Sequence, residues 1–377
     1  MTDSSSTSTT EDKESLNVLM ISHLFPPETG GVQRLAEQLA INTRHEITVL
    51  ASPTNEPDWD NRYDFPVHRY PLTGIPGLFI QFFIVAWLSI RTDVVYFTRP
   101  EYAFFGAPAR ILGKPVVTHA HGSELYANDK LLHKTYLRLS KRVVTRFIAI
   151  SAWTRDRLLD LGVPREKISV LHNGVDFNRF HTSISDVSSP IEKESPSLLT
   201  VGRIVERKGH THVIRALPDI NQAAEYFVVG PGDSEPLREV AAEEEVINQV
   251  HFVGKIPEEE LIKYYQQADV FVMPAELIDG DIEGFGLVYL EANAAGTPAV
   301  GSNVGGVPSA IQDGVTGEIC EPTQKSVANS INNILEDDEY RESLSEAAIT
   351  WASEHDWSNV AATWSDMIEK ETLLMKN

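Results

Sequence analysis

The sequence predicts an α/β protein with two doubly wound domains, each a parallel sheet covered by helices on both faces, that meet at a cleft. Short continuous runs rich in Val, Ile and Leu alternate with helical segments, and buried parallel strands have this pattern. The alternation breaks at a polar stretch and then starts again. The chain of 377 residues is long enough for two domains with full cores.

The first domain is expected over residues 16–185, after a Ser/Thr-rich segment, residues 1–15, with the composition of a disordered tail. A glycine pair, Gly30-Gly31, follows the first predicted strand and precedes a helix. The apolar run at 78–88 is too short to cross a bilayer. It is expected to be a core helix, with a helix at a membrane interface as the alternative. Strands are predicted at residues 17–22, 46–51, 93–97, 115–119 and 146–150.

A polar linker, residues 186–197, is expected to lead into the second domain, residues 198–355, where the alternation resumes. Apolar residues recur at helical spacing in the last segment, residues 356–377, so a final helix is predicted there. Strands in this half are predicted at residues 198–201, 226–229, 251–253, 270–273 and 298–301.

Charge and composition exclude several classes of protein. The net charge of −22, from 32 basic and 54 acidic residues, repels nucleic acid phosphates and disfavours nucleic-acid binding. A single cysteine, Cys320, excludes an internal disulfide and a cysteine metal cluster. No signal peptide and no spanning apolar run are present, so a cytosolic protein is expected. No G-x-G-x-x-G follows the first strand of either domain, which disfavours a nicotinamide dehydrogenase.

The most informative segment runs from Glu283 to Glu291, where two carboxylates flank a Gly-Phe-Gly turn and the start of a helix predicted at 287–295. Backbone amides at a helix N-terminus bind phosphate well. One carboxylate can accept a hydrogen bond from a hydroxyl on one side of that phosphate, and the other carboxylate can do so on the opposite side. A nucleotide-sugar, with ribose, diphosphate and hexose, is such a ligand. The alternative is a buried helix with two solvated acids.

Two further loops follow predicted strands and carry polar side chains. Arg203 and Lys208 lie in a glycine-flanked loop where they can neutralise a diphosphate, or else they are surface cations beside Glu206. His121 can contact a sugar hydroxyl or carry a proton, although lone histidines are more often structural. His119, two positions earlier, suggests a metal pair, but no further ligand is evident and no metal is expected.

Residues 130–146 form a basic stripe in this acidic chain, because their cations recur at helical spacing with no acid among them. Such a helix can dock on anionic lipid headgroups, or it can be a solvated face. The cations are Lys130, Lys134, Arg138, Lys141, Arg142 and Arg146.

These segments together resemble the retaining glycosyltransferases of family 4, which have the GT-B fold, from about Val18 to about Thr350. The segment from Glu283 to Glu291 is most similar to the branch of phosphatidylinositol-mannoside mannosyltransferases. The matched motifs, in order, are Gly30-Gly31-Val32, His121-Gly122, Ser151 through Asn173-Gly174-Val175-Asp176 to Phe180, Gly202-Arg203 with Lys208-Gly209, Gly254, Glu283 to Glu291, Gly305-Gly306-Val307-Pro308, and Gly314 to Gly317.

The resemblance implies catalytic roles for four matched residues. His121 would contact the transferred sugar, and Glu283 would bind hydroxyls of the donor sugar. Arg203 and Lys208 would bind the diphosphate. The acid-rich loop at 276–282 departs from the family pattern and can reshape the sugar pocket.

The resemblance also implies a set of donor-binding positions. Glu291 would hold the ribose hydroxyls, and backbone around Ile256 would face the base. The final helix would cross back onto the first domain. The remaining donor-binding positions are Gly30 and Gly31 from the first domain and Phe285, Gly286 and Leu287 beside Glu283.

Physical reasoning about the reaction favours front-face transfer, in which the leaving diphosphate helps to deprotonate the acceptor hydroxyl. Two side-chain cations replace a divalent ion, so no metal or other cofactor is expected. GDP-mannose is the first choice of donor and UDP-glucose the next. The acceptor is expected to be a membrane lipid or lipid-linked glycan at the inner membrane face. The alternatives are an enzyme that makes a soluble disaccharide or sugar phosphate, and a nucleotide-sugar-binding protein without catalysis.

Overall fold

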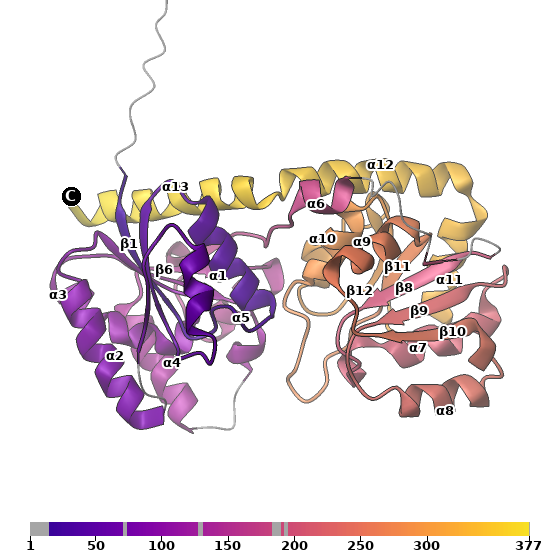
Figure 1. The fold of residues 1–377 in the computed structure, drawn as a ribbon, viewed down its shortest axis with the longest axis horizontal. Helices are drawn as coiled ribbons and strands as arrows, with labels where there is room; N and C mark the ends of the chain where they lie inside the picture. Colours follow the sequence, from indigo (N-terminus) through magenta and orange to yellow (C-terminus); the bar gives the residue numbers. More distant parts are fainter. Residues whose placement is uncertain (1–14, 71–73, 127–130, 183–189, 192–194, 377) are drawn as a thin grey trace, which may run out of the picture.

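The computed structural model describes residues 15–70, 74–126, 131–182, 190–191 and 195–376. The chain forms two parallel sheets, one of seven strands and one of six, each with helices on both faces (Figure 1). This arrangement confirms the predicted α/β class with two doubly wound domains. The predicted tail, residues 1–15, lies outside the described part except for Ser15.

The first sheet has the order β3-β2-β1-β4-β5-β6-β7, so β1, β4 and β5 are neighbours in its centre. Helix α1 (Gly31–Asn42) follows β1 and turns Leu35 and Leu39 into the core. The predicted strands are present to within a residue or two. The edge strands β3 and β7 were not predicted, because each has three residues and includes polar ones. The strands are β1 (Asn17–Ser22), β2 (Glu46–Ala51), β3 (Val67–Arg69), β4 (Val94–Phe97), β5 (Val116–Ala120), β6 (Arg146–Ala149) and β7 (Ile168–Val170).

Three segments cover the outer face of the first domain: α2 (Gly74–Leu88), the 3-10 helix η2 (Pro100–Gly106) and α4 (Leu131–Val143). Phe82 of α2 lies 6.4 Å from Phe105, and Phe104 stacks on Tyr136 of α4 at 5.0 Å between ring centroids. The helices α2 and α4 therefore pack against the same 3-10 helix. The shorter helices of this domain include α3 (Ala107–Ile111), η3 (Ser123–Leu125), α5 (Ala152–Asp160), η1 (Pro57–Arg62) and η4 (Arg165–Lys167).

Helix α2 contains the apolar run at 78–88, and the prediction of a core helix is wrong for one of its faces. Val85 is fully buried, but Phe83 and Trp87, four residues apart, are 68% and 57% exposed. Among the described residues, no helix is long and apolar enough to cross a membrane.

The basic stripe on α4 contributes fewer free cations than its sequence suggests. Arg138 and Arg142 are exposed, whereas Lys141 Nζ donates to the carbonyl of Leu161 at 2.6 Å. Arg146 Nε binds Glu371 at 2.7 Å. The side chains of residues 130–134 lie outside the described part.

The second sheet has the order β10-β9-β8-β11-β12-β13, with β8 and β11 in its centre. Its strands are β8 (Ser197–Val201), β9 (Glu225–Val229), β10 (Val250–Gly254), β11 (Val270–Met273), β12 (Ala299–Ser302) and β13 (Gly317–Cys320). Its helices are α7 (His210–Ala216), α8 (Glu235–Glu243), α9 (Glu258–Gln267), α10 (Leu287–Ala294), α11 (Gln324–Glu336) and α12 (Asp338–Glu354).

The chain enters the second domain earlier than residue 185. Val175 and Phe180 are buried in the core of the second sheet, and Phe180 lies on the short helix α6 (Phe177–His181). Most of the predicted linker at 186–197 lies outside the described residues, and Ser197 already belongs to β8.

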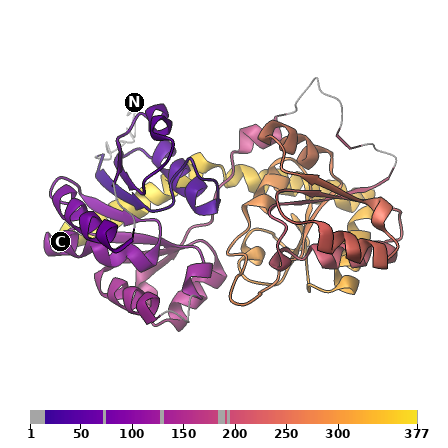
Figure 2. The same cartoon turned by 60° about the horizontal axis from the view of Figure 1, so that its bottom comes forward.

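The chain returns to the first domain through α13 (Trp357–Lys376), which follows α12 and lies along the first domain, whereas α12 lies along the second (Figures 1 and 2). Trp364 of α13 is fully buried and meets Tyr96 of β4 edge-to-face at 5.0 Å. The two crossovers lie side by side, since the Val175 amide donates to the carbonyl of His355 at 2.9 Å. The final helix therefore completes the core of the first domain.

Candidate active site

The loop that follows β8 holds a buried lysine. Lys208 Nζ donates to the carbonyl of Val201 at 3.3 Å and lies 3.1 Å from the Sδ of Met273. Gly202 lies against the end of the Lys208 side chain, and its φ of 136° is a backbone conformation that favours glycine. Burial lowers the pKa of the Lys208 ammonium, and the nearby Glu283 acts in the opposite direction. Among the described residues, no carboxylate is hydrogen-bonded to the Lys208 ammonium.

The loop that follows β11 carries Glu283 to the N-terminus of α10. The Oε2 of Glu283 accepts a hydrogen bond from Arg207 Nη1 at 2.7 Å, and Arg207 Nε binds Asp281 at 3.0 Å. Phe285 is buried, and the amides of Gly286 and Leu287 lie in the first turn of the helix. The predicted carboxylate and the predicted phosphate-binding helix end are therefore adjacent.

Glu291 is buried one turn into α10 and is bound from both domains. Its Oε2 accepts from the Tyr265 hydroxyl at 2.8 Å, and its Oε1 lies 3.1 Å from Arg34 Nη1. Arg34 lies on α1 of the first domain and also reaches Glu258 of α9 at 3.4 Å. Burial raises the pKa of the Tyr265 hydroxyl well above its usual range, and the Glu291 carboxylate adds to this. The carboxylate of Glu291 thus lies between a phenol and a guanidinium.

His121 follows β5 and faces the second domain. Its Nε2 lies 2.8 Å from the carbonyl of Thr98, and a carbonyl only accepts, so Nε2 carries the hydrogen. Burial lowers the pKa of the imidazole. The neutral ring therefore has its lone pair on Nδ1. Its backbone amide donates to Glu124 Oε1 at 2.5 Å, which fixes the loop.

The two domains touch at the loops just described. A Cβ at Gly284 would lie 1.9 Å from the backbone oxygen of His121, so this contact requires glycine. A Cβ at Gly31 would lie 3.7 Å from Leu287 Cδ1, which places the glycine pair opposite the start of α10. His121, Glu283, Gly31 and Leu287 therefore converge from both domains.

The other predicted residues make fewer contacts at this site. Arg203 is exposed, and its guanidinium has no hydrogen-bond or ion-pair partner within the described ranges, while its backbone is hydrogen-bonded by the His210 imidazole. Ile256 lies just after β10 and is half-buried against the second core. Gly30 precedes α1 in extended backbone. His119 is fully buried against the Tyr96 hydroxyl, so it is a core residue. The described residues contain no group of three metal-ligating side chains.

Sequence reasoning missed the partners of the predicted acids, above all Arg34 and Arg207. Arg34 comes three residues after the glycine pair, and Arg207 stands between two predicted cations. Because both arginines lie beside predicted donor-binding residues, their positions in the sequence indicate that they lie near the site. Their pairing with Glu291 and Glu283 depends on how the loops meet in space.

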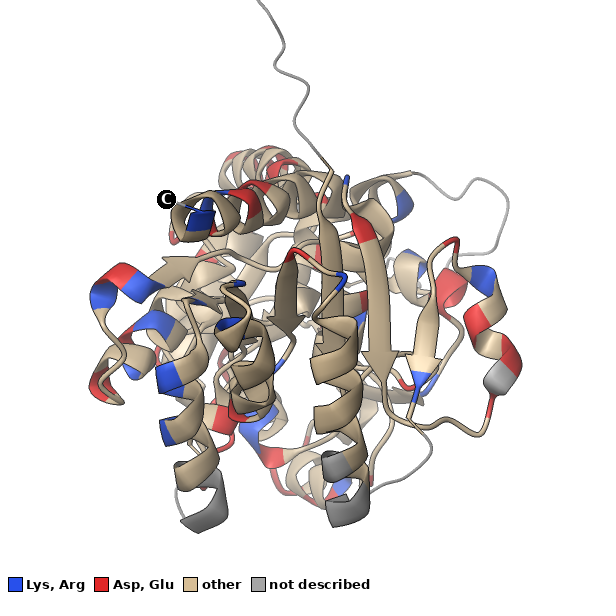
Figure 3. Ribbon diagram, turned by 90° about the vertical axis from the view of Figure 1, so that its left-hand side faces the viewer, with Lys and Arg blue, Asp and Glu red and all other residues tan. Residues whose placement is uncertain are grey.

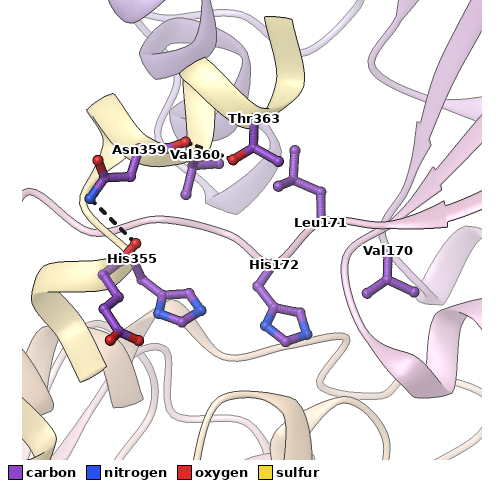
Figure 4. A pocket seen from close by; sticks show the side chains of 8 residues that line it. Val170, Leu171, His172, His355, Asn359, Val360 and Thr363 are labelled. Carbon is purple, nitrogen blue, oxygen red and sulfur yellow. Dashed lines mark hydrogen bonds between the residues drawn. The ribbon is translucent and has the colours of Figure 1, made fainter. Parts of the chain in front are cut away.

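A cavity of about 270 Å³ lies at the crossovers, lined by His172 and His355 together with Val360 and Thr363 (Figure 4). The imidazoles of His172 and His355 stack with their centroids 5.7 Å apart. Burial and the neighbouring His355 lower the pKa of His172 to about 4. None of the predicted catalytic residues lines this cavity, which lies beside the two crossovers.

Comparisons with known proteins agree with the geometry. The family model for Glycosyltransferase Family 4 matches residues 29–179, and the model for Glycosyl transferases group 1 matches residues 183–351. The chain is 29% identical to a GDP-mannose-dependent alpha-(1-6)-phosphatidylinositol monomannoside mannosyltransferase of Mycolicibacterium smegmatis, over 93% of this chain and 98% of that relative. It is 27% identical to a mannosyltransferase named for the monoacylated form of that acceptor in Corynebacterium glutamicum, over 96% and 98% of the two chains.

Solved structures share the whole fold. Anabaena HepE in complex with UDP superposes with a TM-score of 0.81 at 20% identity, covering 94% of this chain and all of that one. Sucrose-phosphate synthase from Thermosynechococcus elongatus gives a TM-score of 0.77 at 22% identity, covering 96% and 100%. The chain therefore belongs to the family 4 glycosyltransferases, has the GT-B fold, and is a hexosyltransferase that uses a nucleotide-sugar.

Proposed function

We propose that this enzyme transfers mannose from GDP-mannose to a hydroxyl acceptor on a lipid or lipid-linked glycan, with retention of configuration. The observation that carries the proposal is the contact between the His121 loop and the Glu283-Gly284 loop at the start of α10. GDP-mannose is supported by the names of relatives that match along more than nine-tenths of the chain. UDP-glucose is the second candidate donor.

We assign the residues as follows. Glu283 binds donor-sugar hydroxyls, and the backbone amides of Phe285, Gly286 and Leu287, at and just before the start of α10, lie beside the diphosphate. Glu291 accepts from the ribose hydroxyls, and the backbone near Ile256 faces the base. The exposed Arg203 and the buried Lys208 supply positive charge, with Gly30 and Gly31 opposite. His121 contacts the transferred sugar through its Nδ1.

In the proposed reaction, the bond between the anomeric carbon and the phosphate oxygen breaks. A bond from the acceptor oxygen to that carbon forms on the same face. The acceptor proton passes to the leaving phosphate oxygen, whose charge the two cations stabilise. The interdomain contact keeps water from the sugar.

We propose that the reaction needs no metal, because Arg203 and Lys208 supply the charge that a divalent ion would. Chelation with EDTA is therefore expected to leave turnover unchanged in a transfer assay. Loss of activity that added Mg²⁺ or Mn²⁺ restores would contradict this assignment.

The donor is tested first by thermal unfolding with GDP, UDP, ADP and their sugar conjugates. A ligand that binds only the folded state raises the unfolding temperature. A selective shift with GDP and GDP-mannose supports the donor assignment. A selective shift with UDP-glucose would replace it. No shift in folded protein would count against catalysis and favour a degenerate binding protein.

We propose that the enzyme meets its acceptor at an anionic membrane face, through α4 and α2. Arg138 and Arg142 are exposed on α4, in a chain whose net charge is −22. Helix α2, in the same domain, carries no charged residue (Figure 3). Its Phe83 and Trp87 side chains are exposed. Aromatic side chains beside cations suit the headgroup region of a bilayer.

The membrane proposal is tested by sedimentation with liposomes, with and without anionic lipid. The variant R138E/R142E is expected to lose binding to anionic vesicles, and W87A to weaken it, because charge and aromatic insertion contribute separately. K325E, an exposed charge reversal on α11 in the other domain, is the matched control. Absence of wild-type binding would favour the enzyme that makes a soluble product.

A further inference from the structure

We infer that Arg207 is a positioning residue that holds Glu283 in the orientation needed to bind the donor sugar. The inference rests on the role proposed for Glu283 and adds a residue that the resemblance does not assign. Arg207 lies in the phosphate loop, between Glu206 and Lys208, yet its side chain turns toward the sugar loop. It therefore links the two loops on which the proposed chemistry depends.

The contacts of Arg207 tie it to both ends of one segment. Its backbone carbonyl accepts from the amide of Glu276 at 2.7 Å. Its Nε binds Asp281 at 3.0 Å, and its Nη1 binds Glu283 Oε2 at 2.7 Å. The Arg207 side chain is only 12% exposed, against 58% for Asp281. The guanidinium is thus held inside, with two carboxylates fixed on its edge.

The segment from Glu276 to Glu283 is the acid-rich loop that departs from the family pattern, and it is ordered by a tight hairpin. The backbones of Ile278 and Asp281 exchange hydrogen bonds of 3.1 and 2.8 Å. Asp279 and Gly280 between them have φ of 49° and 82°, the left-handed pair of a type I′ turn. This turn fixes the register that places Asp281 beside Arg207.

The hairpin is anchored at its other points as well. Glu276 Oε1 lies 2.7 Å from His212 Nε2 at the base. At the tip, a Cβ on Gly280 would lie 3.4 Å from the Cβ of Tyr126 in the first domain. The loop therefore forms a strap between the domains, and Arg207 connects that strap to Glu283.

The geometry has a direct consequence for sugar binding. Arg207 occupies one oxygen of Glu283, and no hydrogen bond within the described ranges reaches the other oxygen, Oε1. A carboxylate fixed through one oxygen can present the second to sugar hydroxyls without reorganising. The guanidinium also offsets the charge of Glu283, which would otherwise repel the donor diphosphate. Lysine cannot reproduce both contacts, because it lacks the planar fork.

The test compares R207Q, R207K and D281N with D279N, which changes the exposed hairpin tip and keeps a residue type that accepts positive φ. For each protein, kcat and KM are measured with the donor that the wild type accepts, GDP-mannose first. Affinity for the bare nucleoside diphosphate is measured by calorimetry, and folding by thermal unfolding. A displaced reacting group costs on the order of 10²-fold in rate.

We expect R207Q to lower kcat roughly 10- to 100-fold, while affinity for the bare nucleoside diphosphate stays within about twofold of wild type. R207K is expected to recover part of that loss, and D281N to lose roughly threefold to tenfold. D279N is expected to behave as wild type. D281N keeps the test informative if R207Q does not fold, because Asp281 is exposed.

The outcomes separate this inference from the proposed function. A wild-type protein that neither binds nor uses any nucleotide-sugar would refute the function itself. An active wild type with unchanged kcat in R207Q and D281N would overturn the inference alone. Equal losses of nucleoside diphosphate and nucleotide-sugar affinity would make Arg207 a phosphate ligand instead. Equal impairment of D279N and D281N would attribute the effect to hairpin charge.

Discussion

Lys208 is the buried cation for which we propose a role at the donor diphosphate. Its ammonium is hydrogen-bonded to a carbonyl and a thioether, and to no carboxylate among the described residues. We predict that K208A lowers turnover at saturating donor by roughly 10²-fold, the size of one electrostatic contact to developing charge. Steady-state kinetics with K325A as the surface control tests this. Unchanged turnover would remove Lys208 from the catalytic set.

Gly284 is needed for the contact between the two domains, because the His121 backbone already fills the space that a side chain would take. A Cβ there would lie 1.9 Å from the backbone oxygen of His121, and backbone cannot swing away as a side chain can. We predict that G284A separates the two loops and lowers kcat at least tenfold, since small displacements in an active site are costly. A crystal structure and kinetics of the variant check this. Wild-type kcat would show that the two loops need not touch.

At the scale of elements, α13 contributes the largest fully buried side chain of the first domain, Trp364. We predict that W364A destabilises the protein by about 3–5 kcal/mol, the usual cost of deleting a buried tryptophan. L373A on the same helix, at an exposed position, is expected to change stability by less than about 0.5 kcal/mol. Urea unfolding measures both. Equal effects would mean that α13 is not part of the core.

The strands and helices also show which parts of the fold the sequence predicts. Central strands such as β1 and β11 were predicted residue for residue, because strands buried on both faces are continuous apolar runs. Edge strands such as β13 were missed, since a short strand with a polar residue lacks that pattern. The exposed face of α2 was also missed, because it is apolar all round and periodicity cannot identify which face is covered.

The sequence likewise reveals some residues of the candidate site and not others. Motif residues such as Glu283 and His121 lie at the domain contact where the resemblance placed them, although their roles stay predictions. Arg34 and Arg207 could not be assigned, since their partners come from a distant helix and a hairpin. The packing of Val175 and Phe180 in the second core depends on where the chain crosses between the domains, which a local pattern does not reveal.

At the scale of the whole molecule, two chain crossings join the domains, and a pair of stacked histidines lies between them (Figure 4). Burial, with the neighbouring His355, lowers the pKa of His172 to about 4, and burial also lowers the pKa of His355. Hydrogen bonding to the Trp351 carbonyl and the charge of Glu354 act in the opposite direction on His355. Two imidazoles that stay neutral near pH 7 therefore lie where the two crossovers meet.

The neutral pair predicts a loss of stability in mild acid. A histidine with an ordinary pKa of 6.5 takes up its proton in the unfolded chain first, so stability is full above about pH 6.5 and falls as the pH drops toward 4. We expect H172N to flatten the fall in unfolding temperature between pH 7 and pH 5. H181N, which replaces an exposed histidine on α6, is expected to keep the wild-type slope. If H172N and wild type show the same change of unfolding temperature with pH, protonation of His172 does not cause the loss of stability.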